Sequence, residues 1–394
     1  MRRSHAPVLL AALAASSLAH GAGFGIYEWS PSFNATGGTI LGKPVDAATA
    51  FINPAAMTEL PGTQVSLGAT GILRYSTTQI GIVENKLKHQ SFLIPGIHAT
   101  SQLNEMFWLG FGSSAEFGMG TKYEKGWRGN WSNIETDLLT YTVAPTLGVK
   151  VLDNLSLAAG PRIMYVDFMH RNNKIGAAYG GAYLPLTIQG DSIGYGGIAS
   201  LLWKITDEIG FGLVYRSQVK QTVEGTARSV VPGYYGTAKG SITFPASTTA
   251  GLNWQATSDL NLGVSVTFTE WSSYDELCIK VNGIPNADEK KWDDVWRFGA
   301  GAQYKLTDTI TVLGGYVFDQ DPINSKHIDY MLPPGDRHML NTGLSFALGK
   351  NLDFSIGYTY MFMQTQFQMV RDSIPTKFKD SDAHLISSGL AYRF

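Results

Sequence analysis

Apolar and polar residues alternate through most of the chain after residue 61. From residue 260 the side chains of Leu260, Leu262, Val264, Val266 and Phe268 occupy every second position, with small or polar residues between them. Because successive side chains of a strand point to opposite faces, this stretch predicts a strand with one apolar and one polar face. Its length of about ten residues suits a tilted strand that crosses a bilayer.

Short polar segments interrupt the alternation about every 50 residues, a period that fits two membrane strands and one long loop. They contain residue types that favour tight turns, namely Asn104, Asp153, Asp207, Asp259, Asp308 and Asn351. Six such turns separate seven pairs of strands. We therefore expect an all-β fold, a transmembrane 14-stranded antiparallel β-barrel over residues 62–394, with both chain ends on the same side.

Aromatic residues support this expectation. Trp203, Trp254 and Tyr304 each precede one of these turns by four or five residues and fall on the predicted outer face. Amphipathic rings favour the interface between membrane and water. The last predicted strand carries apolar residues at alternate positions up to the terminal Phe394, as closing strands of bacterial outer-membrane barrels do.

The segment before residue 62 lacks any strand alternation. It contains many small residues and one candidate short helix over residues 45–50, which Asn53 and Pro54 would end. A compact segment that precedes a barrel of this size can lie inside it. We therefore expect residues 20–61 to form a plug, or hatch, within the lumen.

The first 19 residues have the features of a secretory signal peptide. Arg2 and Arg3 precede an apolar stretch over residues 7–18, and Ser17-Leu18-Ala19 offers small residues for cleavage. No later stretch approaches the ~20 apolar residues of a membrane-spanning helix. The protein is therefore expected to be exported and to cross a membrane with strands.

Composition favours the barrel and excludes several functions. The chain has 44 glycines, 12% aromatic residues and only 16% charged residues, and its net charge of −2 gives no indication of nucleic-acid binding. The single Cys278 allows no internal disulfide. His170, His338 and His384 lack catalytic or metal-ligand spacing, so we expect no enzyme activity, no metal and no cofactor.

An ordered series of short motifs resembles the FadL family of outer-membrane transporters for long-chain fatty acids and other hydrophobic compounds. The series comprises Gly23-Phe24 with Glu28, Asn53-Pro54-Ala55, Phe117-Gly118-Met119-Gly120, Trp127-Arg128-Gly129, Tyr215-Arg216-Ser217, Glu270-Trp271-Ser272-Ser273-Tyr274-Asp275, Gly315-Tyr316-Val317-Phe318-Asp319 and Asp336-Arg337. The resemblance covers nearly the whole mature chain. It departs from the family pattern at Glu116, where many members carry Pro, and over residues 32–37.

The resemblance implies a location in the bacterial outer membrane and passive transport. It implies capture at a hydrophobic groove in the extracellular loops, binding in a luminal pocket, rearrangement of the hatch and exit through a gap in the wall near the third strand. Hatch residues carried over from the motifs are Phe24, Glu28, Asn53, Pro54 and Ala55. The implied partners are a long-chain fatty acid or another hydrophobic small molecule and the membrane lipid, with the protein a monomer.

The predicted register also gives ligand-binding candidates. Arg162, Arg216 and Arg297 point inward and are candidates for the head group of an acidic amphiphile. The candidates for its tail are Met164, Val166, Phe168 and Val214. The alternative is that each arginine pairs with a carboxylate of the wall or hatch, such as Glu28, Asp46 or Glu59.

Two glycines of the predicted third strand, Gly110 and Gly112, are candidates for the lateral opening because glycine permits bulges in a strand. The alternative is that they make room for hatch side chains.

Two other functions stay open. One is uptake of aromatic or aliphatic hydrocarbons, which would have no use for a luminal arginine. The other is a porin for polar solutes, against which the apolar luminal positions argue.

Overall fold

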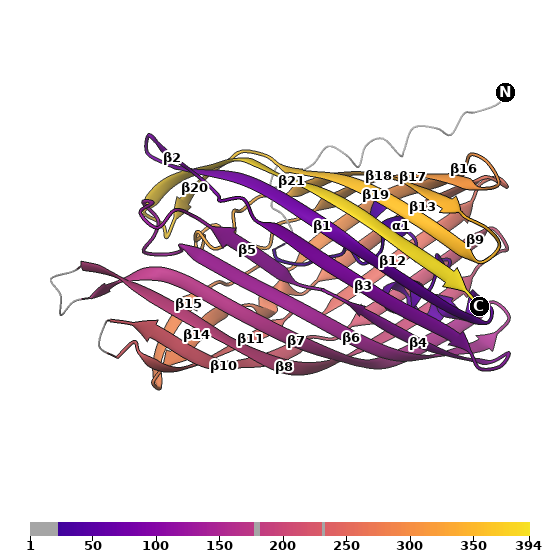
Figure 1. Ribbon diagram of the computed structural model, residues 1–394, viewed down its shortest axis with the longest axis horizontal. Helices are drawn as coiled ribbons and strands as arrows, with labels where there is room; N and C mark the ends of the chain where they lie inside the picture. The colour runs from indigo at the N-terminus through magenta and orange to yellow at the C-terminus, as the bar shows by residue number, and fades with distance from the viewer. Residues whose placement is uncertain (1–22, 177–181, 231–232) are drawn as a thin grey trace, which may run out of the picture.

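The computed structural model describes residues 23–176, 182–230 and 233–394. The predicted signal peptide and residues 20–22 of the predicted hatch lie outside these residues. The described residues form a long barrel of tilted strands around a helical segment (Figure 1).

Fourteen strands make the barrel wall. In chain order they are β1 (Thr63–Ile80), β3 (Ser91–Gln102), β4 (Phe107–Ser114), β6 (Glu135–Leu152), β7 (Leu155–Gly176), β8 (Ala182–Lys204), β9 (Ile209–Arg216), β12 (Ser247–Gln255), β13 (Leu260–Thr269), β16 (Val295–Lys305), β17 (Ile310–Asp319), β18 (Arg337–Ala347), β19 (Leu352–Met363) and β21 (Ile374–Arg393). Each pairs antiparallel with the next, and β21 pairs with β1, which closes the barrel. The predicted 14-stranded antiparallel barrel is confirmed.

The two ends of the barrel differ. The six polar segments picked out in the sequence all form short turns at one end, where the carboxyl terminus also lies (Figure 1). At the other end the wall is extended by seven further strands. These are β2 (Val83–Lys86), β5 (Gly118–Lys122), β10 (Val219–Ser229), β11 (Gly236–Phe244), β14 (Glu276–Val281), β15 (Ile284–Glu289) and β20 (Gln366–Val370).

The outer face of the barrel is apolar. On β13, Leu262 and Val264 are exposed, whereas Asn261 and Thr267 on the other face are buried. Trp203, Trp254 and Tyr304 are also exposed, close to the short turns. A surface of this kind suits contact with lipid chains, with aromatic rings near the interface. Among the described residues, no helix has the length and apolar character needed to cross a bilayer.

Residues 23–61, hereafter the hatch, fold inside the barrel (Figure 1). They form helices α1 (Pro31–Ala35) and α2 (Thr49–Ile52) and a 3-10 helix over Pro54–Glu59. The sequence predicted one short helix over residues 45–50, ended by Asn53 and Pro54. The end is confirmed, because α2 stops at Ile52, directly before Asn53. The start was wrong, because Asp46 accepts a hydrogen bond from the Ala48 N–H and starts a turn, so that regular helix begins only at Thr49.

Polar side chains of the wall hold the hatch backbone. Asn253 accepts hydrogen bonds from the N–H groups of Leu41 and Gly42, at 3.0 and 2.8 Å. Within the hatch, Asn53 donates to the carbonyl of Leu41 at 2.7 Å. These bonds satisfy backbone groups of a non-strand segment that is shut away from water, where an unpaired group would be costly.

The carboxyl end of the hatch is anchored near the short turns. Ala55 donates its N–H to the hydroxyl of Ser200 at 2.9 Å. Glu59 forms ion pairs with Lys150 at 3.3 Å and with Lys204 at 3.0 Å. The last residues of the hatch, directly before β1, are therefore fixed to the wall.

Glycines let the hatch backbone touch the wall directly. A Cβ atom added to Gly210 would lie 1.9 Å from the carbonyl oxygen of Gly42, and one added to Gly42 would lie 2.0 Å from that of Gly210. Both distances are far below van der Waals contact, and both partners are backbone atoms that no side-chain rotation can move away. The contact therefore requires glycine on both chains.

We predict that Gly210→Ala lowers the free energy of unfolding by about 1–3 kcal/mol or more, since overpacking forces backbone shifts. Chemical denaturation in detergent micelles measures this. Gly314→Ala is the matched control on β17, because its nearest neighbour, the Asn341 carbonyl, lies 3.9 Å from the added atom. Equal stability of the two variants would contradict the prediction.

Candidate functional site

The hydrogen-bond ladder of the wall has a lateral gap between β3 and β5. β3 pairs with β4 only over residues 97–102, so residues 91–96 have no partner on that side among the strands that the structure describes. The chain leaves β4 at Ser114, turns inward and resumes as β5, which pairs with β6 alone among the described strands. A hydrogen bond from the Lys88 N–H to the Lys122 carbonyl closes the gap at the long-loop end of the barrel.

The first residues of the hatch pair with the edge of the gap that faces β3, at residues 116–118. The Ile26 N–H donates to the Glu116 carbonyl at 2.8 Å, and the Gly118 N–H donates to the Phe24 carbonyl at 2.9 Å. The start of the hatch therefore acts as a short strand laid against residues 116–118 from inside the barrel. A side chain covers the gap as well, because the ring of Phe92 on β3 packs on Gly120 of β5.

A cavity of about 270 Å³ opens inward from this gap, and we call it the arginine pocket. Its walls come from the hatch, from β3, β5 and β6 beside the gap, and from strands on the opposite side. The lining residues are Gly25, Ile26, Glu28, Ile72, Arg74, Ser91, Phe92, Leu93, Ile94, Gly118, Met119, Gly120, Leu138, Leu139, Arg297, Arg337, Met339, Met361 and Leu385. Leu93 is 65% exposed on the outer surface, so the cavity borders the lipid-facing side of the wall.

The arginines of the arginine pocket differ in their partners. Arg297 is paired with Asp319 at 2.8 Å. Arg74 and Arg337 form no ion pair within 4 Å among the described residues. Arg74 donates to Thr121 at 3.4 Å, and Arg337 donates to the Gly23 carbonyl. The carboxylates of Glu28, Asp319 and Asp321 interact with Arg337 only over longer distances, so two guanidinium groups of the pocket lack a direct ion-pair partner.

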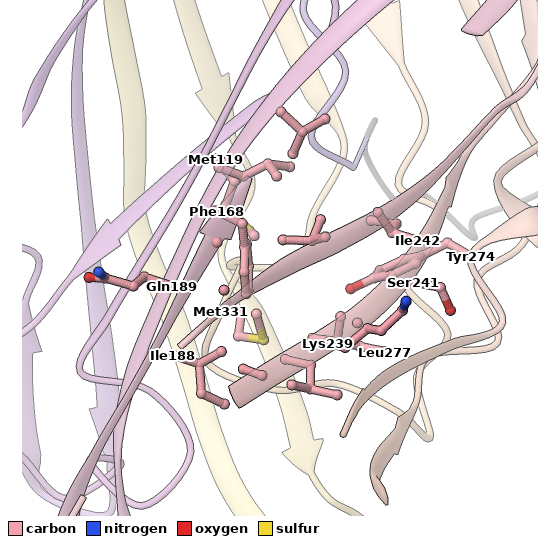
Figure 2. Close-up of a pocket in the computed structure, with 18 of the residues that line it drawn as sticks. Met119, Phe168, Ile188, Gln189, Lys239, Ser241, Ile242, Tyr274, Leu277 and Met331 are labelled. Atoms are coloured by element: carbon pink, nitrogen blue, oxygen red, sulfur yellow. The ribbon is translucent and has the colours of Figure 1, made fainter. Parts of the chain in front are cut away.

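A second, narrow cavity of about 40 Å³, the apolar chamber, lies toward the long-loop end. It is bounded by β7, β8, β10, β11 and β14, and the side chains of Met119, Phe168 and Met331 gather around it, whereas Gln189 points away (Figure 2). Other lining side chains include Val166, Ile188, Ile242 and Leu277. The chamber suits an apolar ligand because most of its lining residues are apolar, with Lys239, Ser241 and Tyr274 as polar exceptions.

Two residues, Met119 and Leu138, line both cavities. Phe24 lines the apolar chamber, and the next residue, Gly25, lines the arginine pocket. Phe24 is buried against Trp271, with ring centroids 4.6 Å apart, and against Tyr274 at 5.7 Å. The first residues of the hatch therefore form the partition between the two cavities.

The three arginines predicted from the sequence are all inward and all paired with wall carboxylates. Arg162 and Arg216 converge on Glu116, and Arg297 pairs with Asp319. Of the three, only Arg297 lines the arginine pocket. Glu59, an alternative partner in the sequence reading, pairs with two lysines instead. A role in head-group binding stays a prediction for each arginine.

The predicted tail residues divide between two environments. Val166 and Phe168 line the apolar chamber. Met164 is fully buried in the adjoining apolar cluster, and Val214 is fully buried against hatch residues such as Phe51. Two of the four therefore face a cavity, and Val214 packs the hatch against the wall.

Gly110 and Gly112 lie in regular ladder on both sides, with partners on β3 and on β6. A Cβ atom at Gly110 would lie 2.7 Å from the Met57 sulfur, and one at Gly112 would lie 2.6 Å from the Phe51 Cβ. These glycines make room for the hatch. The ladder is interrupted after Ser114, a few residues further on.

Sequence reasoning did not select Arg74 and Arg337 as ligand candidates. Arg74 was recognisable as inward from the alternation of β1, and Arg337 belongs to one of the family motifs. No sequence feature showed that these two lack carboxylate partners, because their surroundings come from the hatch and from β5, β18 and β19.

The loop between β17 and β18 holds two buried carboxylates. Asp321 accepts hydrogen bonds from the N–H groups of Ile323 and Gly335, and Asp336 accepts one from the N–H of Asp321. Burial and the nearby Asp319 carboxylate raise the pKa of Asp336 to about 7. Burial likewise raises the pKa of Asp321 well above its usual range.

Comparison with known proteins places this geometry in a family. The model of a family described as "Outer membrane protein transport protein (OMPP1/FadL/TodX)" matches residues 12–394. The chain belongs to this family. The FadL resemblance drawn from the motifs is thereby confirmed, as is the location in the outer membrane. The short-turn end of the barrel is then the periplasmic end and the long-loop end the extracellular one.

Members of the FadL family with curated descriptions are distant relatives. A "Long-chain fatty acid transport protein" of Salmonella typhi is 24% identical over 392 residues, which cover 89% of each chain. "Outer membrane protein P1" of Haemophilus influenzae is 24% identical over 407 residues, which cover 89% of this chain and 88% of that one.

Solved structures show the same fold. A Pseudomonas aeruginosa FadL homologue superimposes with a TM-score of 0.87 at 20% identity, covering 95% of this chain and 100% of that one. The Ralstonia pickettii toluene transporter TbuX gives a TM-score of 0.75 at 17% identity, covering 93% and 98%.

We predict that the extracellular loop between β17 and β18 becomes less stable as pH rises. The folded state holds the proton of Asp336 up to about pH 7, whereas the usual pKa is 3.8. Stability is therefore greatest below the lower value and is lost as pH rises through the higher one. Asp336→Asn cannot ionise and should flatten the dependence of the melting temperature on pH across this window.

The exposed Asp308, which pairs with Lys305 in a periplasmic turn, provides the control. Asp308→Asn should leave the pH profile of the melting temperature unchanged between the same limits. A profile for Asp336→Asn that is as steep as that of the wild type would contradict the role of this carboxyl.

Proposed function

We propose that this FadL-family protein takes up long-chain fatty acids, or closely similar anionic amphiphiles, passively across the outer membrane. The ligand enters the apolar chamber from the extracellular loops and passes the partition at Phe24. It then binds in the arginine pocket and leaves sideways through the gap between β3 and β5. The names of the relatives from Salmonella typhi and of other fatty-acid transport proteins support this assignment.

The two guanidinium groups of the arginine pocket without a direct ion pair are the observation that carries the proposal. Among the described residues, Arg74 and Arg337 have no carboxylate within 4 Å, and the cavity that they line is otherwise formed largely by side chains such as Ile72, Met339 and Met361. An anionic head group would supply the missing partner, and charge-assisted hydrogen bonds are the strongest available to it. The apolar walls would hold the tail.

Passage needs no energy source under this proposal. Each step keeps the apolar tail out of water, and burial of a methylene group is worth about 0.8 kcal/mol. Exit through the gap delivers the tail directly to the lipid chains of the membrane. The ligand would therefore move from one apolar environment to the next.

Two other functions make different demands. The apolar chamber alone would accept a neutral hydrocarbon, as the likeness to toluene transporters of known structure suggests. Such a ligand would gain nothing from Arg74 and Arg337. A porin for polar solutes would need an open aqueous bore, whereas the hatch occupies this lumen with buried residues.

We predict that Arg74→Ala and Arg337→Ala each weaken the binding of a long-chain fatty acid about 10-fold or more, since a hydrogen bond to a charged group is worth about 1.5–3 kcal/mol. Calorimetric titration with the acid and with the alcohol of the same chain length measures the effect. The wild type should prefer the acid, and the double variant should bind both ligands alike.

Arg393→Ala is the control, because Arg393 pairs with Asp353 at the periplasmic end of the barrel. Its affinity for the fatty acid should match that of the wild type. If the double variant still preferred the acid over the alcohol, the arginine pocket would not be the head-group site.

We also predict that Phe92→Ala speeds transfer of ligand to the membrane, because the ring that packs on Gly120 across the gap is then absent. Uptake of labelled fatty acid by cells that lack their own transporter measures the rate. Phe298→Ala removes a lipid-facing ring from β16 and should have no effect. A slower or unchanged rate in a folded Phe92→Ala variant would exclude exit at this point.

A further inference from the structure

Glu116 lies where the wall turns inward between β4 and β5, beside the lateral gap. Its side chain is only 4% exposed. The backbone carbonyl accepts the hydrogen bond of Ile26 that holds the start of the hatch on the gap edge. The carboxylate accepts a hydrogen bond from the Thr142 hydroxyl at 2.7 Å, which fixes its direction.

Two buried arginines converge on this carboxylate from other strands. Arg162 of β7 donates to Oε2 of Glu116 and, through its other terminal nitrogen, to the Ser217 carbonyl at 2.8 Å. The Nε atom of Arg216 on β9 lies 3.2 Å from Oε1 of Glu116. The guanidinium groups of both are almost fully shielded from water.

Arg216 carries the connection onward into the hatch. It donates to the carbonyls of Phe51 and Ile52 at the end of α2, the second at 3.3 Å. Its guanidinium also stacks over the ring of Trp29, 4.5 Å from the centroid. A single carboxylate therefore touches the first residues of the hatch through its backbone and the middle of the hatch through Arg216.

The charge balance makes Glu116 decisive for this cluster. Two buried guanidinium groups share one carboxylate, and removal of that carboxylate would leave both uncompensated. An unpaired buried charge is strongly destabilising, so the arginines would seek water or other acceptors. The contacts of Arg216 with α2 depend on this arrangement.

We propose that Glu116 is a positioning residue that couples the first residues of the hatch and helix α2 to the edge of the lateral gap, so that these two segments loosen together. Release of the first hatch residues from residues 116–118 disturbs the backbone of Glu116. The same residue holds Arg216 and, through it, α2. The role of this coupling in ligand exit rests on the proposed function. The coupling itself is a property of the protein that needs no ligand.

The chain offers a matched control in Glu135. This glutamate is equally buried, with 7% of its side chain exposed, and pairs with two cations, Lys122 and Arg171. It lies on β6 beside the same gap. Among the described residues it has no hydrogen bond or ion pair to the hatch.

Hydrogen–deuterium exchange on the full-length protein in lipid nanodiscs tests the coupling. Glu116→Gln removes the carboxylate charge, and the double variant Glu116→Gln/Arg162→Gln also keeps the net charge of the cluster, in case the single variant does not fold. We expect exchange at Ile26 and at the α2 amides Ile52 and Asn53 to become roughly tenfold faster or more, since a charged hydrogen bond is lost. Glu135→Gln should leave both segments as in the wild type.

Exchange that stays unchanged in both segments, or that rises in one segment alone, would overturn the coupling. An equal effect of Glu135→Gln would overturn it too, because the loosening would then follow from any buried charge lost near the gap. The experiment uses no ligand. A failure here contradicts the coupling alone, whereas a wild-type protein that takes up no fatty acid contradicts the proposed function alone.

Discussion

The need to pair every backbone polar group inside a membrane governs this structure. A barrel meets the need by closing its ladder, since no water is available to an open edge. This barrel closes at β21 and β1, but among the described strands residues 91–96 of β3 have no partner on one side. The hatch pairs with the other edge of the gap, at residues 116–118, from within. The hatch therefore meets the requirement on one edge of the gap and leaves the β3 edge open.

The same requirement explains how the hatch is packed. A segment without strands, enclosed in a barrel, must find acceptors and donors on the wall, and Asn253 and Ser200 provide them. Where no side chain fits, the hatch backbone contacts the wall backbone directly, as at Gly42 and Gly210. The high glycine content of the chain thus serves the contact between wall and hatch at these positions.

The sequence was sufficient for the wall and insufficient for the pocket. Alternation and turn residues such as Asp259 predicted the strands and their number, because these depend on local periodicity. The orientation of Arg162 and Arg216 followed from the same periodicity. Their pairing with Glu116 did not, because the partner comes from a different strand, at a point where the chain leaves the regular ladder.

The two glycines of β4 illustrate a second limit. A glycine in a strand permits either a bulge or a close neighbour, and the sequence alone does not distinguish the two. At Gly110 and Gly112 the neighbour is the hatch, through Met57 and Phe51. Such contacts depend on how a segment far away in the chain folds, so they become visible only in three dimensions.

The unequal attachment of the hatch has a consequence for the cell. Glu59 and Ala55 fasten its carboxyl end to the periplasmic part of the wall, whereas its first residues rest on the gap edge. If the first residues and α2 loosen to admit a ligand, the carboxyl end still holds the hatch to the wall inside the bore. A bacterium could then take up hydrophobic compounds without losing ions or admitting hydrophilic antibiotics through the same protein.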